Sequence, residues 1–504
     1  MEARFSSPIA CPVVFGRTRE LSTLRLLIER VRSGETQVVL ISGEAGIGKS
    51  RLAAEVKAEF LTHGFLLLEG QCFQADSTSP YVPLLDLFRA YFSRWVPTPS
   101  ADPTYTFAST LSRLLPELAL LFPNLATLHG SPPVEPEEEK RHLFATMTHF
   151  VIEQATQHPM MLMIEDIHWC DDLSLDLLLH LVRRCRQVPL LLLVTYRHDE
   201  QHPRLRRWLT QLDRERVGQE CSLKRLSRDD VAGMIRVMLN QQQEVDVNLI
   251  DTLYTRSEGN PFFVEELLKS LMTSGESAFP AGTWKLTTHR TLIPRSVEEA
   301  VQQRTAYLST EARHLVTLAA VAGRRFNVTL LREILQYEEE QVLALLKEVM
   351  AAQLVVEEAP DQFAFRHALT QEAIMASLLL RERQGVHRRI AETLERLSAS
   401  SSPLRERSLE DLAYHCYEAG LWEQALAYAQ KAGEKALRLY AQQAAIDHFT
   451  RAIEATHYLS LPPPASLYLA RGQAYETLGD FERARHDYEH ARAAARTAQD
   501  SLNR

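Results

Sequence analysis

Eight residues, Gly43 to Ser50, have the types and the spacing to bind phosphate groups. Their sequence fits G-x-x-x-x-G-K-[ST], the pattern of a phosphate-binding loop. In such a loop the backbone N–H groups surround the phosphates, the lysine reaches the β- and γ-phosphates, and the serine hydroxyl ligates Mg²⁺. The sequence therefore predicts a site for ATP or ADP with Mg²⁺. The residues assigned to it are Gly43, Glu44, Ala45, Gly46, Ile47, Gly48, Lys49, Ser50 and Arg51.

The residues on either side of this loop predict the structure that it needs. Residues 37–42 form a short apolar run with β-branched side chains, which is typical of a buried parallel strand. Residues 51–56 are mostly good helix formers. A strand, a glycine-rich loop and a helix N-terminus direct backbone N–H groups at an anion. The alternative interpretation of the loop is a glycine turn with no ligand.

Two acidic residues, Glu165 and Asp166, follow a second apolar run at 160–164. Carboxylates at the end of a strand beside a phosphate-binding loop can organise Mg²⁺ and orient an attacking water. By register we expect Glu165 to hold the metal, through water, and Asp166 to orient the attacking water. The usual order of the two acids is Asp then Glu, so this division of roles stays open. The alternative is a strand that simply ends in solvated acids.

A third apolar run, residues 189–196, ends at Arg197 and follows a predicted helix at 173–186. This alternation predicts parallel strands joined by helices. In open α/β folds ligands bind beyond the carboxyl ends of such strands, where Arg197 emerges. We therefore include Arg197 with Glu165 and Asp166 as catalytic candidates, as a cation that senses the γ-phosphate. An arginine at this position can also be merely solvated.

Five motifs occur in the order and spacing of a known protein class. Together they resemble the STAND class of signal-transducing AAA-type ATPases. Within that class the sequence looks closest to the branch found in large LuxR-type transcriptional regulators and in bacterial ATPases linked to adenylyl cyclases or serine/threonine kinases. The resemblance covers residues 10 to about 390. The motifs are residues 15–21, 43–50, 162–169, 195–197 and 259–267.

The resemblance implies roles that the residues alone do not. It implies that Arg197 is the sensor arginine of an ATP or ADP site. Taken alone, residues 259–261 predict only a turn before a helix that opens at Phe262. In the STAND class the corresponding motif belongs to a helical lid that closes over the base. The resemblance places Phe15, Gly16 and Arg17 beside the adenine and the ribose. It places Asn260 and Pro261 over the base, as part of the lid.

Residues 295–385 predict a different fold. A capping box at 296–299 opens a helix, and further helical runs are followed by a hairpin with a turn at 360–361. Helices and a hairpin in this order are typical of a winged helix. The STAND resemblance implies that it is a regulatory clamp, and His367 resembles the histidine that contacts the β-phosphate in the ADP-bound state. The alternative is that His367 caps the next helix. The predicted helices are 311–322, 328–335 and 339–352, and the predicted strands are 354–358 and 362–366.

Residues 386–504 are helical and rich in Ala, Tyr, Leu and Glu. Small residues that follow a helix with an aromatic side chain recur at Ala425, Ala445 and Ala484, as in tetratricopeptide repeats. Their spacings of 20 and 39 residues differ from the ideal of about 34, so we expect degenerate repeats, or alternatively a plain helical bundle. We expect a shortened member whose relatives continue into more repeats or an output domain. The predicted division is a tail (1–12), a P-loop NTPase domain (13–225), a helical lid (226–290), a winged helix (291–385) and tetratricopeptide-like repeats (386–504).

The composition limits the function classes. The chain of 504 residues has a net charge of −9 and a pI near 6.1, which argues against a dedicated nucleic-acid binder. No apolar run approaches the ~20 residues of a membrane span, and the N-terminus lacks the apolar core of a signal peptide. Scattered cysteines without a C-x-x-C pair predict reduced thiols in a cytoplasmic protein, with neither a zinc site nor disulfides. These cysteines are Cys11, Cys72, Cys170, Cys185, Cys221 and Cys416.

These observations predict a multidomain fold, with a doubly wound parallel sheet of the AAA type, a helical lid, a winged helix and an α-solenoid. The predicted function is an ATP-binding and slowly hydrolysing ATPase that works as an ADP/ATP switch in transcriptional or cyclase-type signalling. A protein partner or inducer would bind the repeats, and the ATP form would associate with itself. Three alternatives remain: a DNA-binding initiator-type ATPase that uses the winged helix, a repeat scaffold with a vestigial ATPase, and the regulatory half of a cyclase or kinase. Direct nucleic-acid binding and membrane association are not expected.

Overall fold

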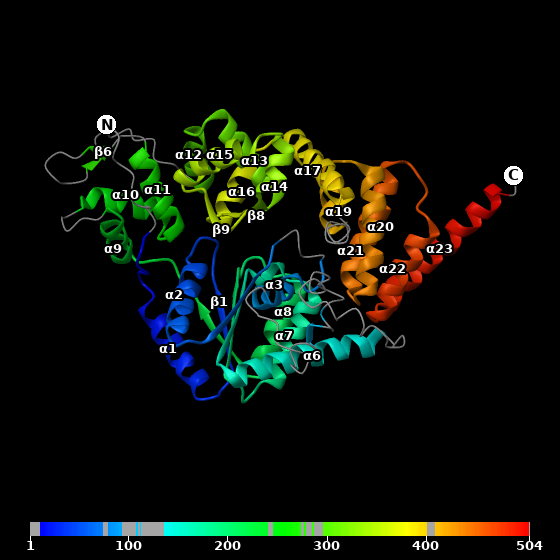
Figure 1. Ribbon diagram of the computed structural model, residues 1–504, viewed down its shortest axis with the longest axis horizontal. Helices are drawn as coiled ribbons and strands as arrows, with labels where there is room; N and C mark the ends of the chain where they lie inside the picture. The colour runs from blue at the N-terminus through cyan, green and yellow to red at the C-terminus, as the bar shows by residue number, and fades with distance from the viewer. Residues whose placement is uncertain are drawn as a thin grey trace. The chain divides into compact units, whose positions relative to one another are not determined.

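The computed structural model describes residues 11–73, 79–92, 107–108, 111, 136–239, 245–273, 277–278, 285–286, 296–400 and 409–502 (Figure 1). The chain divides into two compact units, each of which combines segments that are distant in the sequence. The phosphate-binding loop belongs to the first unit, and the two acids at 165–166 belong to the second. The first unit contains Met1–Arg25, Ile41–Val56 and Cys221–Thr393, and the second contains Leu26–Leu40, Lys57–Glu220 and Leu394–Arg504.

Five strands form one parallel sheet in the order β2-β3-β4-β1-β5. In the centre of it, Leu162 of β3 lies opposite Leu68 of β2 and Leu192 of β4. The three predicted strands are present as β1, β3 and β4, and they are buried on both faces, which is why they have no polar alternation. The sequence does not predict β5, because its residues are largely polar and exposed. The strands are β1 (Gln37–Ser42), β2 (Leu66–Gln71), β3 (Met160–Glu165), β4 (Leu190–Tyr196) and β5 (Gly218–Ser222).

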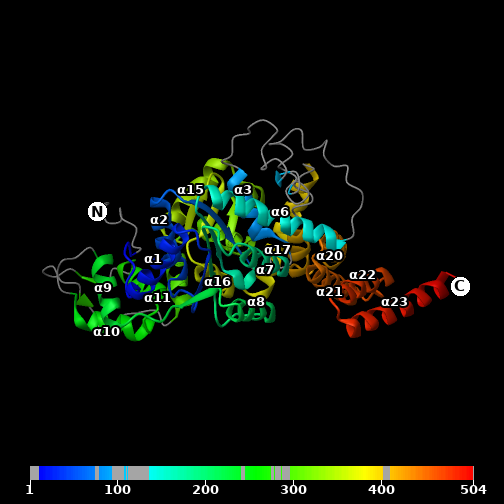
Figure 2. The same cartoon turned by 90° about the horizontal axis from the view of Figure 1, so that it is seen from below.

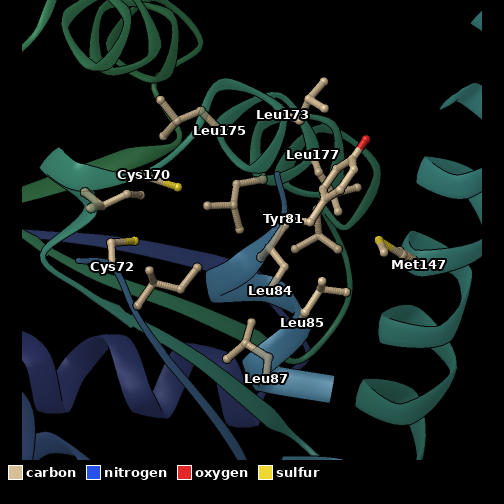
Figure 3. Close-up of a cluster of buried hydrophobic side chains, with 14 of the residues drawn as sticks. Cys72, Tyr81, Leu84, Leu85, Leu87, Met147, Cys170, Leu173, Leu175 and Leu177 are labelled. Carbon is tan, nitrogen blue, oxygen red and sulfur yellow. The ribbon is translucent and has the colours of Figure 1, made fainter. Parts of the chain in front are cut away.

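Helices connect these strands and supply most of the apolar core. Figure 3 shows part of that core, where the leucines of α3 and α7 pack together beside Cys72 and Cys170. These two cysteines lie near each other although they are far apart in the sequence, and burial raises the pKa of both thiols. All six cysteines are free thiols. The helices are α1 (Thr18–Arg32), α2 (Lys49–Thr62), α3 (Val82–Phe92), α6 (Pro136–Gln157), α7 (Asp172–Arg184) and α8 (Pro203–Arg214), with a 3₁₀ turn at Ile167–Trp169.

Three helices after β5 form a small bundle with its own apolar core. Ser227 begins the first of them through a capping box with Asp230, and the Asp246 carboxylate caps the second. The third begins at Pro261, whose fixed φ suits the first position of a helix. The helices are α9 (Arg228–Met238), α10 (Val247–Ser257) and α11 (Pro261–Thr273), and the short strands β6 (Ser277–Ala278) and β7 (Lys285–Leu286) pair antiparallel after them.

Residues 296–376 contain the predicted helices and the predicted hairpin. A third strand, β8, pairs with β10 and completes a sheet in the order β8-β10-β9. β8 is only three residues long, which is too short for a periodic pattern to predict it from the sequence. The elements are α12 (Val297–Ala306), α13 (Thr310–Ala322), β8 (Arg325–Asn327), α14 (Val328–Leu335), α15 (Glu339–Ala351), β9 (Val355–Ala359), β10 (Gln362–Phe365) and α16 (Ala368–Ala376).

The remaining described residues are helical, and each helix from α19 to α23 packs against the next (Figures 1 and 2). A residue with positive φ ends the turn of each connection: Gly420, Tyr440, Ser460 and Gly479. These residues recur every 19 or 20 positions, so the 20-residue spacing of Ala425 and Ala445 is the length of one helix with its turn, and 39 is the length of two. The helices are α17 (Leu380–Ser400), α19 (Leu409–Glu418), α20 (Trp422–Arg438), α21 (Gln442–Tyr458), α22 (Ala465–Thr477) and α23 (Phe481–Leu502).

None of the helices in the described part of the chain is both long enough and apolar enough to cross a membrane.

Candidate nucleotide site

The phosphate-binding loop connects β1 to α2 and has the backbone that only glycine readily adopts. Gly43, Gly46 and Gly48 have φ values of +154°, +75° and +101°. Helix α2 begins at Lys49, and its first internal hydrogen bond joins Leu52 N to Gly48 O at 2.9 Å. The amides at the start of the helix, which have no partner one turn earlier, therefore follow the loop directly. A Cβ on Gly48 would meet no described atom within 4 Å, whereas a Cβ on Gly46 would be crowded.

The carbonyl groups of the loop are all engaged by donors of the protein. Each of the five consecutive carbonyls from Gly43 to Ile47 accepts a hydrogen bond, so these oxygens are held by protein atoms. The N–H of a peptide points away from its C=O, so these bonds fix the directions of the loop N–H groups, as an anion-binding nest requires. One of these groups, the Ile47 N–H, donates to Glu44 O at 3.3 Å. The donors are Lys49 Nζ for Gly43 (2.9 Å) and Glu44 (2.8 Å), Asn260 Nδ2 for Ala45 (3.0 Å), Phe262 N for Gly46 (3.3 Å) and Arg17 Nη2 for Ile47 (3.1 Å).

The two polar side chains of the motif differ in burial. Lys49 is 7% exposed, and its ammonium group lies against the loop, within reach of the anion that the loop would surround. Ser50, in the first turn of α2, is exposed, as a metal-ligating hydroxyl needs to be. Arg51 is also exposed and donates to the carbonyl of Pro12. The glycines, the donor set and Lys49 thus fit a bound polyphosphate.

The predicted residues before α1 lie between the loop and the first helix of the small bundle. The Phe15 ring packs on Gly233 of α9, where an added Cβ would be 2.8 Å from Phe15 Cε1. Gly16 has a φ of +65° and lies against Asp230. Arg17 is buried, and burial lowers the pKa of its guanidinium although it remains a cation that donates to the loop.

The turn at residues 259–261 contacts the loop itself. The Asn260 side chain donates to Ala45 O, and its Oδ1 accepts from the N–H groups of Phe262 (3.1 Å) and Phe263 (3.4 Å) at the start of α11. Asn260 thus caps the helix and binds the loop with the same amide group. The next N–H, that of Phe262, donates to Gly46 O. The sequence shows the turn, but the contact with the loop depends on packing across more than 200 residues.

His367 lies at the N-cap position of α16, but its side chain makes no capping hydrogen bond. Instead, the imidazole packs against the Phe262 ring, with 4.6 Å between the ring centroids. Its Nε2 atom is buried and has no hydrogen-bond partner among the described residues. Burial, followed by the charge of Lys269, lowers the pKa of His367 to about 3, so the ring is neutral at neutral pH. Leu369, two residues after His367, lies against Gly46 of the loop.

The acidic pair and the arginine belong to the second unit. Glu165 is the last residue of β3, and Asp166 follows it in the left-handed conformation (φ +57°), where its N–H donates to Thr195 Oγ1 at 3.0 Å. Arg197 follows β4, but it is not a solvated arginine. It is 7% exposed, and its Nη1 lies 2.6 Å from Glu200 Oε1.

Two further residues contact predicted site residues but have no obvious signal in the sequence. Glu200 also lies 3.5 Å from Nε2 of His168, which is 1% exposed. The acid three residues after Arg197 therefore joins that arginine to the histidine after β3. Arg225 is another such residue, since it joins Glu44 of the loop (3.0 Å) to Glu258 just before the turn at 259–261. The signals that could have indicated these contacts are the short Arg197–Glu200 spacing and the position of Arg225 directly after β5.

Comparisons with known proteins find a family model for the first part of the chain. Residues 13–194 match the family model described as "AAA ATPase domain". An uncharacterized protein of Rhizobium meliloti (strain 1021) is 28% identical over 447 residues, which are 84% of this chain and 40% of that protein. The chain therefore spans less than half the length of that curated relative.

Similar folds occur in solved structures of low sequence identity. A STAND protein with a tetratricopeptide repeat sensor from Pyrococcus horikoshii is 14% identical, with 98% of this chain and 78% of that chain covered and a TM-score of 0.43. ORC2 of Aeropyrum pernix, solved in ADPNP and ADP complexes, is 14% identical, with 72% and 95% covered and a TM-score of 0.35. Cdc6p of Pyrobaculum aerophilum is 10% identical, with 74% and 98% covered and a TM-score of 0.35. By the family model, residues 13–194 of this chain are similar to an AAA ATPase domain.

Proposed function

We propose that the protein is an ATP-binding, slowly hydrolysing ATPase that acts as an ADP/ATP conformational switch in signalling. The observation that carries this proposal is the set of five loop carbonyls held by protein donors, beside a motif lysine and serine. Such a loop has the N–H groups and the cation that a nucleotide polyphosphate needs. Mg²⁺ bound by Ser50, and through water by Glu165, would neutralise phosphate charge during hydrolysis.

The residues of the second unit would complete the reaction. Because parallel strands β3 and β4 end at the same edge of the sheet, we expect Glu165, Asp166 and Arg197 to serve one reaction. Asp166 would accept a proton from the attacking water or orient it, and Arg197 would respond to the γ-phosphate. The pairing of Arg197 with Glu200 supports a responsive role, since a γ-phosphate would compete with Glu200 for the guanidinium.

The lid would give the switch its movement. Asn260 and Phe262 of the α9–α11 bundle bind the carbonyls of Ala45 and Gly46, so a change in the loop changes the contacts of the bundle. In the same proposal, residues 296–376 are a winged-helix clamp. His367 would donate to the β-phosphate of ADP from a neutral imidazole, which its buried and unpaired Nε2 supports.

The switch must also satisfy the arithmetic of a two-state equilibrium. Moving it from 1:99 to 99:1 requires ATP to prefer the open state by about 5.5 kcal/mol. A triphosphate with Mg²⁺ that forms several charge-assisted hydrogen bonds is a ligand of this strength. The helices after α17 would act as degenerate tetratricopeptide repeats that take up a protein partner or an inducer. The ATP form would then associate with itself, as expected for the branch found in LuxR-type and cyclase-linked proteins.

The nucleotide content of the purified full chain tests this proposal. The protein is denatured, and the supernatant is resolved by anion-exchange chromatography. Near-stoichiometric ADP is the expected result, since a closed switch retains its product. If the chain is empty and also fails to bind Mg-ATP in a titration, the proposal is wrong. Turnover by Asp166→Asn then tests the chemistry, because this variant should bind Mg-ATP but hydrolyse it more slowly.

A further inference from the structure

Helix α11 contains a fully buried carboxylate that the proposed nucleotide contacts do not explain. Glu266 is 0% exposed, and its two oxygens face two cations. Arg304 of α12 donates to one oxygen, and Lys269 Nζ donates to the other at 3.2 Å. Burial alone would raise the pKa of Glu266, but the charges of Arg304 and Lys269 outweigh it and hold that pKa below its usual value. Glu266 is therefore an ionised group in an apolar interior.

Arg304 extends this cluster to a third helix. Its Nη2 donates to the carbonyl of Ala352, at the end of α15, at 2.6 Å. One buried guanidinium thus connects α11 with α12 and α15. A second polar contact lies beside it, where Ser270 Oγ donates to Gln303 Oε1 at 2.5 Å. The contact between the lid and the helices after residue 296 therefore includes buried charges as well as a polar pair.

The cluster lies one helical turn from the nucleotide loop. Phe262, four residues before Glu266, donates its N–H to Gly46 O and packs its ring against His367. Residues at i and i+4 share one face of a helix. Helix α11 therefore contacts the loop and His367 with its first turn, and Arg304 with its second. A movement of the loop that displaces Phe262 must also act on the Glu266–Arg304 pair.

A buried ion pair can hold two helices together and still allow them to separate. The desolvation cost of the two charges nearly offsets their attraction, so the intact pair adds little net stability. Removing one partner is strongly destabilising, because it leaves a buried charge without compensation. Replacing both partners by apolar side chains of similar size is often neutral or stabilising. When the helices separate, water hydrates both charges again. Apolar side chains at an interface would gain no such hydration.

We propose that Glu266 and Arg304 form a releasable joint, which holds the lid against residues 297–376 in the closed state and separates when the switch opens. The inference rests on the proposed ADP/ATP switch and adds the residues through which loop and clamp are coupled. Arg304 is a positioning residue, since it contacts the loop and His367 only through α11. The joint therefore sets how long ADP is retained.

The dissociation rate of a fluorescent ADP analogue from the full chain tests this proposal. Arg304→Met should raise the rate at least about tenfold, since Glu266 then keeps only Lys269 of its two buried cations, and the poorly compensated charge favours separation and hydration. The apolar pair Glu266→Leu with Arg304→Met removes both charges, while the buried Lys269 keeps a second carboxylate, that of Glu265, at 3.6 Å. This double variant should reverse the effect and release ADP no faster than the unmodified chain. Arg332→Met is the matched control, because it removes a half-exposed arginine of the same module, whose partners Glu333 and Glu339 lie at 3.3 and 3.6 Å, and it should leave the rate unchanged.

The outcomes separate the joint from the switch itself. An unchanged rate in folded Arg304→Met refutes the joint, and so does a double variant that releases ADP as fast as the single one. If Arg304→Met does not fold, the double variant decides, because a rate above that of the unmodified chain contradicts a releasable pair. Absence of ADP binding by the unmodified chain would instead overturn the proposed function, before any variant is compared.

Discussion

An added methyl group should distinguish two glycines of the same loop. Gly46 and Gly48 both have positive φ, +75° and +101°. A Cβ on Gly46 would lie 2.9 Å from Phe262 Cβ, 3.0 Å from Asn260 Oδ1 and 3.0 Å from Leu369 Cδ1. A Cβ on Gly48 would meet nothing within 4 Å in the described part of the chain. Gly46→Ala therefore changes backbone strain and packing, whereas Gly48→Ala changes backbone strain alone.

The expected magnitudes follow from these contacts. A side chain in the left-handed conformation costs about 1–2 kcal/mol relative to glycine, and this cost is common to both variants. Overpacking at Gly46 adds about 1–3 kcal/mol, because Phe262 is fixed in a helix and the Asn260 oxygen is held by two N–H groups. Gly46→Ala should thus destabilise by about 2–5 kcal/mol and Gly48→Ala by about 1–2 kcal/mol.

Thermal unfolding and Mg-ATP titration of the two variants check this reasoning. A difference of about 1–3 kcal/mol corresponds to a lower midpoint for Gly46→Ala by roughly 2–12 °C in a unit of 150–250 residues. For Mg-ATP binding we expect Gly48→Ala to have the larger effect, because its methyl group occupies open space beside the loop and obstructs the phosphates. Gly48→Ala should therefore lose more Mg-ATP affinity than its small loss of stability would explain. Equal midpoints for the two variants would refute the contact between Gly46 and the lid.

Three further predictions concern the site and the repeats. Lys49→Ala should abolish Mg-ATP binding in a folded protein, because the loop loses its cation; unchanged affinity by calorimetry would contradict the site. The pKa of His367, about 3 in the folded chain, lies below its ordinary value of 6.5, so its contribution to stability is full above pH 6.5 and is lost as the unfolded chain takes up a proton at lower pH. Urea midpoints of His367→Gln should accordingly fall less between pH 7 and 5 than those of the unmodified chain, and identical pH profiles would argue against a buried neutral ring. In the repeats, Gly433→Ala should lower the unfolding midpoint, because its Cβ would lie 2.8 Å from the Phe449 ring. Gly385→Ala, whose Cβ would meet no described atom within 4 Å, should instead raise the free energy of unfolding by up to about 1 kcal/mol. Midpoint shifts of the same sign for both variants would show that the helix crossing does not require Gly433.

Local patterns predicted the sheet where the strands are buried on both faces. β1, β3 and β4 appear in the sequence as continuous apolar runs because helices cover both faces of a parallel sheet. β5 has no such run, since most of its residues are polar and exposed. The hairpin of β9 and β10 was predictable from its turn, in which Asp361 has a φ of +62°. Strand β8, at three residues, is too short to carry a period.

Long-range polar contacts were not predictable, for a physical reason. A charged residue in a sequence indicates solvent exposure unless a partner is known, and the partner is chosen by packing. Arg225 pairs with Glu44 across 181 residues, and Arg304 pairs with Glu266 across 38. Arg197, for which a solvated position was one alternative, is buried against Glu200 instead. The sequence predicts the residues of the candidate site, but not the charged residues that contact them.

The spacing of the tail shows how a correct pattern can be hard to interpret. Taken as positions in a repeat of about 34 residues, intervals of 20 and 39 appear irregular. In the structure the turns recur at 19 or 20 residues, so one interval covers one helix and the other covers two. The small residues mark helix crossings, as Gly433 against Phe449 shows, rather than equivalent positions of successive repeats.

The donors of the loop carbonyls have unequal roles once a phosphate is bound. Asn260, Phe262 and Arg17 hold the carbonyls of Ala45, Gly46 and Ile47, and none of these bonds must break for an anion to bind at the N–H groups. Lys49 is different, because the ammonium group that holds the Gly43 and Glu44 carbonyls is also the one expected to reach the β- and γ-phosphates. Binding should therefore alter the first two peptides of the loop directly. The next two carbonyls, of Ala45 and Gly46, are bound by Asn260 and α11, so a change in the first two peptides reaches the lid through these contacts.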